Sequence, residues 1–271
     1  MIVRQRGETL TLAATAAIGF AQIRNIPPGF NMLEVDVPSA TLEDILLAFG
    51  PRIMKVIYLD ASGLLDFQYF DLTDNLLDRN TLTGTGAILN SMTTSDFIYI
   101  CLSRSASGLA VDITNVNGNI AVATYSYLDV GGVWTDLAAT DGTAAAGAML
   151  AVDGLVTWTV PNPELWVARK FYRTDIPAFM KGLHGYWVRI ATSATLDATV
   201  SLVALSALAN INVDTVTAVS GGEARIRIQT NNRGREPSRF RIDLSKYGSM
   251  ELTSTTIVTA ANLNWLEEHG R

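Results

Sequence analysis

Short segments in which apolar and polar residues alternate recur along the chain, and Gly, Asn, Asp or Pro residues separate them. A period of two is typical of β-strands that bury one face. The segment MLEVDV at residues 32–37, for example, alternates in this way between aliphatic residues and acids. Comparable patterns predict strands over 53–59, 65–72, 97–102, 109–114, 120–128, 156–160, 186–191 and 198–205. Strands and turns at such regular spacing predict an all-β protein with a jelly-roll-like β-sandwich.

Three segments depart from this pattern and suggest a domain division. Residues 39–49 (SATLEDILLAF) begin with a Ser or Thr cap, carry acids in the first turn and stop before a Gly-Pro pair, which predicts a short helix near 40–49. Residues 1–30 alternate weakly and contain a Pro-Pro-Gly breaker, which favours an arm or an edge strand. We therefore expect an N-terminal arm at 1–30, a jelly-roll or β-sandwich domain at 31–208 and a C-terminal β-hairpin extension at 209–271.

The C-terminal extension contains regularly spaced arginines. The segments ARIRI at 224–228 and SRFRIDL at 238–244 both alternate, and the segment between them, NNRGR at 231–235, is the expected turn. A hairpin of this kind places four arginines on one basic face, namely Arg225, Arg227, Arg239 and Arg241. This face either contacts an acidic surface of a partner subunit or is exposed to solvent on an ordinary hairpin.

A second hairpin is predicted in the middle of the chain. The segment NVNGN at 115–119 separates two strand patterns, 109–114 and 120–128. Its Asn-Gly pair tolerates the positive φ angles that a tight β-turn requires. The two strands are therefore expected to pair with each other.

Composition favours a protein that assembles. Hydrophobic residues make up 48% of the chain and charged residues only 17%, which is a low charged share for a water-exposed surface. Either a partner or further copies of the chain cover much of the surface, or Ala, Thr, Ser and Gly replace charge on an ordinary β surface. The excess of 16 arginines over 4 lysines favours assembly, because a guanidinium makes bidentate contacts across interfaces.

Charge, cysteine content and hydropathy argue against several classes of function. The net charge of −6 and the pI of about 4.9 oppose binding to nucleic acid. Cys101 is the only cysteine, so neither an intrachain disulfide nor a thiolate metal site can form. The N-terminus lacks the continuous apolar core of a signal peptide, and no apolar run reaches the roughly 20 residues of a membrane helix. We therefore expect a soluble protein, made in the cytoplasm, that does not bind membranes.

Four tryptophans are candidates for a carbohydrate-binding surface, since flat aromatic rings stack on sugar faces. Trp158 and Trp187 alternate with apolar neighbours in predicted strands, so core positions are expected for both. Trp134 follows a Gly-Gly pair and Trp166 lies in a Pro-containing stretch, so loops are expected for these two. Packing against a neighbouring subunit is the preferred interpretation there, and Trp134 and Trp166 join the arginines as candidate interface residues.

No group of residues has the spacing of a catalytic or metal site. Four aspartates in predicted turns have the chemistry of calcium ligands, but without a DxDxDG loop they are expected to cap turns: Asp129, Asp136, Asp141 and Asp153. The two histidines, His184 and His269, are far apart and have no Ser, Cys or paired carboxylates at motif spacing. We therefore expect a non-enzymatic protein with no metal and no other cofactor.

The central aromatic segments resemble a module of tailed-bacteriophage structural proteins. The resemblance spans residues 95–205 and is carried by FIYI at 97–100, YSYLD at 125–129, VWTDL at 133–137, DGT at 141–143, VTWTVP at 156–161 and GYWVRI at 185–190. This jelly-roll or sandwich module recurs in capsid decoration proteins and in tail or baseplate appendages. Its motifs are structural rather than catalytic.

The resemblance implies a protein of the virion. The leading expectation is a capsid decoration or cement protein that contacts the major capsid protein and copies of itself, with the N-terminal arm and the arginine hairpin as contact surfaces. The alternative is a tail or baseplate component that binds a host glycan through loop aromatics such as Trp134 and Trp166. A glycan hydrolase is a third alternative; it would need two carboxylates at a groove, and the sequence singles out no such pair.

Overall fold

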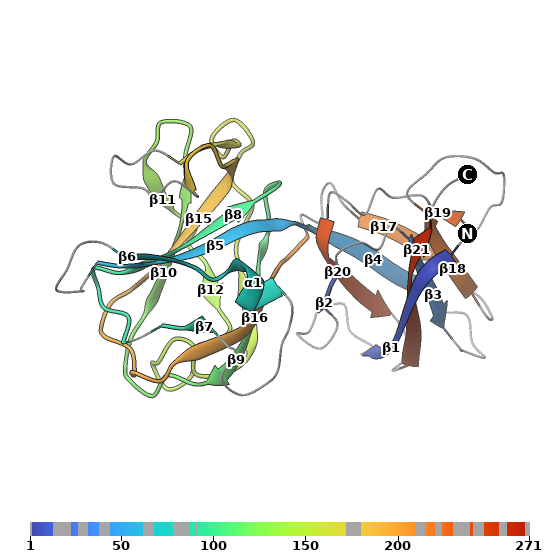
Figure 1. Ribbon diagram of the computed structural model, residues 1–271, viewed down its shortest axis with the longest axis horizontal. Helices are drawn as coiled ribbons and strands as arrows, with labels where there is room; N and C mark the ends of the chain where they lie inside the picture. The colour runs from blue at the N-terminus through green and yellow to red at the C-terminus, as the bar shows by residue number, and fades with distance from the viewer. Residues whose placement is uncertain are drawn as a thin grey trace. The chain divides into compact units, whose positions relative to one another are not determined.

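The computed structural model describes residues 2–12, 23–26, 32–37, 44–61, 68–77, 87–89, 91–171, 180–209, 215–219, 224–229, 239–240, 247–254 and 259–268 (Figure 1). The chain forms two compact units. We call Pro51–Leu208 the sandwich unit, and Met1–Gly50 together with Ala209–Arg271 the terminal unit. Almost all of the regular structure in both units is β-strand, which confirms the predicted all-β class.

Two sheets form the sandwich unit. The seven-stranded sheet has the order β11-β10-β15-β8-β5-β6, with β14 also paired to β15. Its strands are β5 (Ile53–Asp60), β6 (Gln68–Asp71), β8 (Phe97–Leu102), β10 (Ala123–Leu128), β11 (Trp134–Asp136), β14 (Arg169–Lys170) and β15 (His184–Thr192). The second sheet has the order β12-β13-β9-β16-β7, formed by β7 (Ala87–Ile88), β9 (Gly108–Asn115), β12 (Thr140–Asp141), β13 (Gly154–Thr157) and β16 (Ser201–Ala207). All strand pairs in both sheets are antiparallel.

The main hydrophobic core contains side chains from both sheets. Ile100 of β8 and Val188 of β15 belong to the same buried cluster as Val111 of β9, Val156 of β13 and Leu205 of β16. Alternation along each strand explains this arrangement, because every second side chain points toward the other sheet. Burial of each such side chain contributes about 1.5–3 kcal/mol. The predicted β-sandwich is thus confirmed for this unit.

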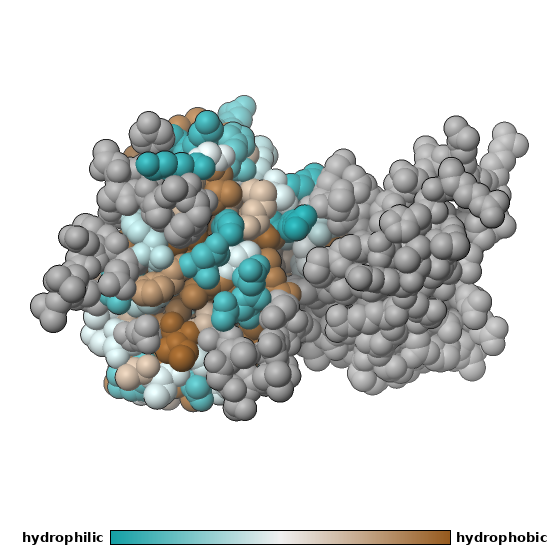
Figure 2. All heavy atoms as spheres, viewed as in Figure 1, coloured by the Kyte–Doolittle hydropathy of each residue, from teal (hydrophilic) through white to brown (hydrophobic). Residues whose placement is uncertain are grey.

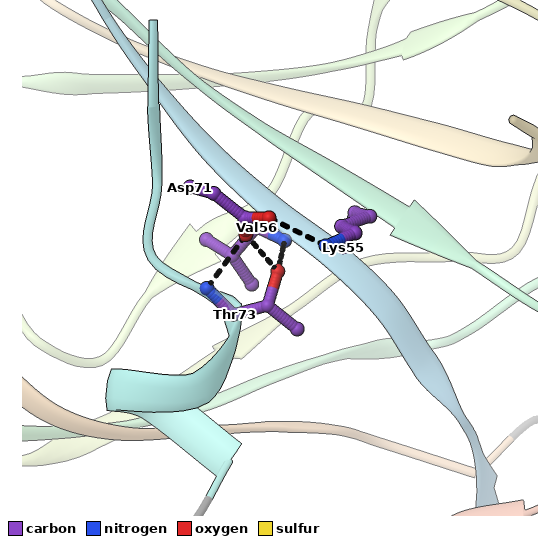
Figure 3. Close-up of polar contacts among 4 residues, drawn as sticks. All are labelled: Lys55, Val56, Asp71 and Thr73. Carbon is purple, nitrogen blue, oxygen red and sulfur yellow. Dashed lines mark hydrogen bonds and ion pairs between the residues drawn. The ribbon is translucent and has the colours of Figure 1, made fainter. Parts of the chain in front are cut away.

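The one helix among the described residues, α1 (Thr73–Leu77), is held at its start by a polar network (Figure 3). The backbone amide and the hydroxyl of Thr73 both donate to Oδ1 of Asp71, at 3.1 and 2.5 Å. The amide of Val56 donates to the Thr73 hydroxyl at 3.0 Å, and Nζ of Lys55 lies 2.5 Å from Oδ2 of Asp71. The network therefore links β5, the end of β6 and the first turn of α1, and its role is structural.

The terminal unit contains two further sheets. One has the order β1-β21-β3-β18-β19, formed by β1 (Ile2–Leu12), β3 (Met32–Val37), β18 (Ala224–Gln229), β19 (Arg239–Phe240) and β21 (Thr259–Glu268). The other has the order β17-β4-β20-β2, formed by β2 (Ile23–Asn25), β4 (Asp44–Pro51), β17 (Thr215–Val219) and β20 (Tyr247–Ser254). Phe49 and Met250 are buried here, and the rings of Phe49 and Tyr247 lie 5.3 Å apart.

Two elements predicted for the terminal unit, a helix and a β-hairpin, differ from the structure. The helix expected near 40–49 is wrong, because Asp44–Pro51 forms strand β4, which pairs with the distant β17. The C-terminal β-hairpin is also wrong: β18 pairs antiparallel with β3, and β19 pairs with β18 in parallel. Both errors arise because short apolar patterns do not specify the partner of a strand.

The domain division also differs from the predicted one over residues 31–50. These residues belong to the terminal unit rather than to the sandwich. The physical reason is strand pairing, since β3 pairs with β18 and β21 while β4 pairs with β17. Ile2–Leu12, within the expected N-terminal arm, is an edge strand paired along its length with β21. The predicted boundary at residue 208 coincides with the end of the sandwich unit.

Candidate functional site

The seven-stranded sheet is covered on both of its faces. Alternation along β8 sends Ile98, Ile100 and Leu102 to the main core, while Tyr99 and Cys101 belong to a separate buried cluster. This second cluster also contains Trp187 of β15 and includes Phe171, which follows β14. The continuous apolar run FIYICL in β8 is therefore explained by burial on two sides.

A positively charged side chain lies among these aromatic rings. The guanidinium carbon of Arg189 lies 4.9 Å from the ring centroid of Phe97 and 4.9 Å from that of Trp134. Each of these cation–π contacts contributes about 0.5–2 kcal/mol, depending on solvent exposure. We call the surrounding group the Arg189 cluster; its members are Phe97, Tyr99, Trp134, Phe171, Trp187 and Arg189.

Strand register explains why these side chains meet. Arg189 stands directly opposite Tyr99 on β8 and opposite Ser126 on β10. Trp134 begins β11, the edge strand next to β10, and its ring lies 5.7 Å from Tyr99 and 5.9 Å from Phe171. Residues that are far apart in the sequence are therefore brought to one face by antiparallel pairing.

Arg189 is a partly buried charge without an ion-pair partner among the described residues. Its Nε is buried and has no hydrogen-bond acceptor in the part of the chain that the structure describes. Among the described residues no carboxylate forms an ion pair with it. Burial lowers the pKa of Arg189 from its usual range, and Tyr99 partly opposes this shift. A guanidinium nevertheless stays protonated at neutral pH, so Arg189 adds a positive charge that no carboxylate of the described residues pairs with.

Next to Trp134, a tight turn is built around one aspartate. Oδ1 of Asp129 accepts the amide of Val133 at 2.8 Å, and Oδ2 accepts the hydroxyl of Thr135 at 3.3 Å. These hydrogen bonds hold the pKa of Asp129 below its ordinary value. Arg169 donates from Nη1 to the carbonyl of Asp129 at 2.5 Å, and Gly132 adopts a φ of 84°. Hydrogen bonds within the chain therefore fix the conformation of this turn.

This turn presents exposed aliphatic side chains. Val130, Val133 and Leu165 are 56%, 61% and 47% exposed. The amide of Val130 donates to the carbonyl of Leu165 at 2.8 Å, which joins the two loops. We call these three residues the Leu165 patch. Hydrophobic side chains also reach the surface elsewhere on the sandwich unit, between hydrophilic ones (Figure 2).

The structure separates the four tryptophans considered above. Trp158 and Trp187 are 6% and 0% exposed, which confirms the predicted core positions. Trp134 is partly buried in the Arg189 cluster and still reaches the surface. The prediction of Trp166 as an interface residue is wrong. Its side chain is only 1% exposed, because its ring packs against Tyr127 and Tyr186 at centroid distances of 5.7 and 5.8 Å. Trp166 is therefore a core residue and offers no surface to a partner.

The predicted arginine face is only partly within the described residues. Arg225 and Arg227 lie on β18 and Arg239 lies on β19, where Arg239 stands opposite Arg227, whereas Arg241 lies outside the described residues. The register also places Arg225 opposite Asp36 of β3 and Arg227 opposite Glu34. Opposite charges at directly paired positions stabilise a sheet. The use of these arginines as an interface stays a prediction.

The turn aspartates act as expected in three of the four cases. Asp129, Asp136 and Asp141 each accept a hydrogen bond from a backbone amide within their own turn. Asp153 instead accepts the amide of Ile113 at 2.8 Å, which links it to β9. In the part of the chain that the structure describes, no group of His, Cys, Asp and Glu side chains is arranged to hold a metal ion.

Cys101 and the two histidines are the remaining candidate side chains. Burial raises the pKa of Cys101 to about 12, so its thiol is an inert core group. His184 is exposed at the start of β15. His269 lies outside the described residues. Arg189 was not anticipated from the sequence, although the segment WVR places Trp187 and Arg189 on one face of a strand.

Comparisons with known proteins do not place the chain in a family. No protein-family model matches the sequence, and no curated protein is similar to it. Among the described residues, no helix has the length and apolar character needed to cross a membrane. A function is therefore inferred from the side chains themselves.

Proposed function

We propose that this chain is a non-enzymatic structural protein of a bacteriophage virion, and specifically a capsid decoration or cement protein that stabilises the shell through contacts with the major capsid protein and with copies of itself. The observation that carries the proposal is the Leu165 patch, a preformed and exposed aliphatic surface on two loops of a rigid sandwich. The resemblance of residues 95–205 to the structural module of tailed phages supplies the virion context.

The Leu165 patch suits a lasting contact. Hydrogen bonds around Asp129 and Arg169 fix its backbone, so little conformational entropy is lost when a partner covers it. Its three side chains are about half exposed. Burying the remainder in an interface contributes about 1 kcal/mol for each, or about 3 kcal/mol in total. Many copies on a shell would add these contributions together.

The terminal unit supplies a second kind of contact in this proposal. β1 and β19 each stand at one end of a strand order, so each has a single neighbour among the described strands. Edge strands accept a further strand from a neighbouring chain. The N-terminal strand and the arginines Arg225, Arg227 and Arg239 therefore remain the proposed contact surfaces of this unit.

The test is rebinding to phage particles from which the protein has been stripped. We expect the protein to bind such particles far better than an unrelated acidic protein of similar size does. The double variant Val133→Ser with Leu165→Ser should weaken rebinding about 30-fold, because it removes about 2 kcal/mol of apolar contact. The matched control is Ile120→Ser with Val122→Ser, at two residues that are 77% and 63% exposed outside the patch. Rebinding no better than that of the acidic protein would exclude the decoration role.

A second candidate is a tail or baseplate component that binds a host glycan. The observation that favours it is Trp134, whose ring is partly exposed next to the guanidinium of Arg189. Aromatic faces beside a hydrogen-bond donor are typical of sugar-binding surfaces. Retention of host glycans by the protein, and loss of this binding in a folded Trp134→Ala variant, would support this role over decoration.

A further inference from the structure

We propose that the Arg189 cluster is a binding site for an acidic saccharide, with Arg189 contacting the carboxylate of a uronic acid and Trp134 contacting its ring. This inference rests on the second candidate function, glycan binding by the sandwich unit, and it names the chemical class of the ligand. The site involves neither the Leu165 patch nor the edges of the terminal unit.

The charge of Arg189 points to an anion. Its guanidinium is partly buried between two aromatic rings, with 4.9 Å from its central carbon to each ring centroid. Two carboxylates share its row across the sheet, but neither of them is an adjacent strand neighbour. Asp136 lies two strands away on one side, paired with Ser126. Asp71 lies three strands away on the other side, after Tyr99 and Ile57. Asp71 already accepts hydrogen bonds from Lys55 and Thr73. Among the described residues no strand neighbour supplies a counter-charge, and we infer that an anionic ligand does.

The groups next to Arg189 suit a carboxylate on a ring. Arginine presents several N–H donors in a plane, and a carboxylate accepts two of them side by side. Ser126 and Tyr99 stand in register on either side of Arg189, and both are buried, so they frame the guanidinium rather than contact a ligand. The guanidinium lies over the ring of Trp134, at the start of strand β11, and this ring is itself only partly buried. The C–H face of a pyranose packs on such a ring while its carboxylate reaches the arginine.

These features favour a sugar over an acidic peptide. An aspartate or glutamate side chain would use the guanidinium alone and leave the surface of Trp134 uncovered. A uronic acid joins a flat apolar face and a carboxylate within one ring, which matches the adjacent positions of Trp134 and Arg189. The arrangement is also preformed, because Trp134 is held against Tyr99 and Phe171, and this lowers the entropy lost on binding.

The experiment is isothermal titration of the full chain with a tetrasaccharide that contains glucuronic acid. The comparison ligands are the same tetrasaccharide with its carboxyl groups reduced to alcohols, and tetraglutamate. We expect the acidic tetrasaccharide to bind, Arg189→Gln to weaken binding about 30-fold and Trp134→Ala to weaken it about 10-fold. The matched control is Arg52→Gln, which removes the same charge at an exposed arginine of the same unit and should change affinity less than about twofold.

A conservative variant keeps the proposal falsifiable if Arg189→Gln does not fold. Arg189→Lys retains the charge but lacks the planar donor arrangement, so binding should fall about fivefold or more. In NMR spectra of the wild-type chain, the indole N–H signal of Trp134 should shift on addition of the acidic tetrasaccharide. Circular dichroism establishes folding for each variant.

The outcomes separate this inference from glycan binding in general. Equal affinity for the reduced tetrasaccharide, with loss in Trp134→Ala, overturns the acidic class but retains glycan binding. Tighter binding of tetraglutamate overturns the saccharide assignment in favour of an acidic peptide. If neither tetrasaccharide binds, the inference is excluded, whereas the second candidate function is excluded only if the protein also retains no host glycan. Equal loss in Arg52→Gln and Arg189→Gln would show that only net charge matters and would overturn the site.

Discussion

Replacing two buried tryptophans with phenylalanine separates the packing of an indole ring from its hydrogen bond. Trp158 and Trp166 are 6% and 1% exposed. Nε1 of Trp158 donates to the carbonyl of Ala106 at 2.7 Å, whereas Nε1 of Trp166 is buried and has no acceptor among the described residues. The substitution removes the same atoms at both sites. A difference in stability between Trp158→Phe and Trp166→Phe therefore shows whether the indole N–H group is hydrogen-bonded.

The expected difference in the free energy of unfolding is about 4 kcal/mol. Loss of ring volume costs about 2 kcal/mol at either site. At Trp158 the change also leaves the carbonyl of Ala106 without this donor, which adds about 2 kcal/mol. At Trp166 the change removes an unpaired buried donor and recovers about 2 kcal/mol of desolvation. Trp158→Phe should thus destabilise the protein by about 4 kcal/mol, whereas Trp166→Phe should be close to neutral.

The assay is urea denaturation of the full chain, followed by far-UV circular dichroism because the substitutions alter fluorescence. Trp187→Phe is the control: Trp187 is 0% exposed and its Nε1 donates to the carbonyl of Arg169 at 3.0 Å. It should behave like Trp158→Phe. If Trp166→Phe lowers stability as much as these two variants do, with the same dependence on urea, the assignment of an unpaired N–H to Trp166 is refuted.

Two further predictions concern a close backbone approach and a titrating network. In Gly154→Ala the new Cβ would lie 2.2 Å from the carbonyl oxygen of Gly142, so we expect a loss of about 3 kcal/mol or more in urea denaturation; Gly131→Ala, which meets only the Asp129 side chain at 3.2 Å, should lose less than about 1 kcal/mol, and equal losses would contradict the prediction. Partial burial raises the pKa of Asp71, but hydrogen bonds from Lys55 and Thr73 outweigh it and leave the pKa below its ordinary value. Its contribution is therefore present above the unfolded pKa of about 3.9 and is lost as pH falls through the lower folded pKa. Asp71→Asn should cost about 1 kcal/mol at pH 6 and nothing measurable near pH 2, and a cost that does not change with pH would oppose this assignment.

Strand positions in the sandwich unit could be predicted well from the sequence. The run FIYICL was expected as a strand at 97–102 and forms β8 over the same residues. The patterns at 109–114 and 186–191 fall within β9 (Gly108–Asn115) and β15 (His184–Thr192). Alternation is a local signal, because burial on one face of a strand requires it regardless of which strand lies alongside. The existence of these three strands therefore follows from local sequence patterns.

Strand pairing could not be predicted, because it depends on residues far away in the chain. The expected hairpin around 115–119 is wrong: β9 pairs with β13 and β16, whereas β10 pairs with β11 and β15 in the other sheet. The amide side chain of Asn117 donates to the carbonyls of Asn119 and Met149 and so fixes a loop that crosses between sheets. The DILLAFG run of β4 suits a helix or a strand equally, and its pairing with β17 decides between them.

Only one of the two central residues of the candidate site could be predicted from the sequence. Trp134 was singled out because it follows a Gly-Gly pair, but Arg189 was not, since one arginine in an apolar strand carries no motif. Their contact requires β15, β10 and β11 to lie side by side. Trp166 shows the opposite error, because its position outside the strands suggested exposure while its ring is buried against Tyr127 and Tyr186. Position in a loop does not determine burial.

The two contact surfaces predicted for the terminal segments lie on the same sheet, one at each end of its strand order. The N-terminal segment and the arginine segment were identified from unrelated sequence features, yet β1 and β19 are the two ends of one strand order, β1-β21-β3-β18-β19. Each is an edge, and an edge strand left open to any chain promotes aggregation unless charges restrict its partners. The sequence of β1 carries Arg4, Arg6 and Glu8, and β18 with β19 carries Arg225, Arg227 and Arg239. Among these strands only β1 and β19 are edges, and charges at such positions disfavour indiscriminate pairing and favour a strand of complementary charge. The decoration role proposed above would require this selectivity.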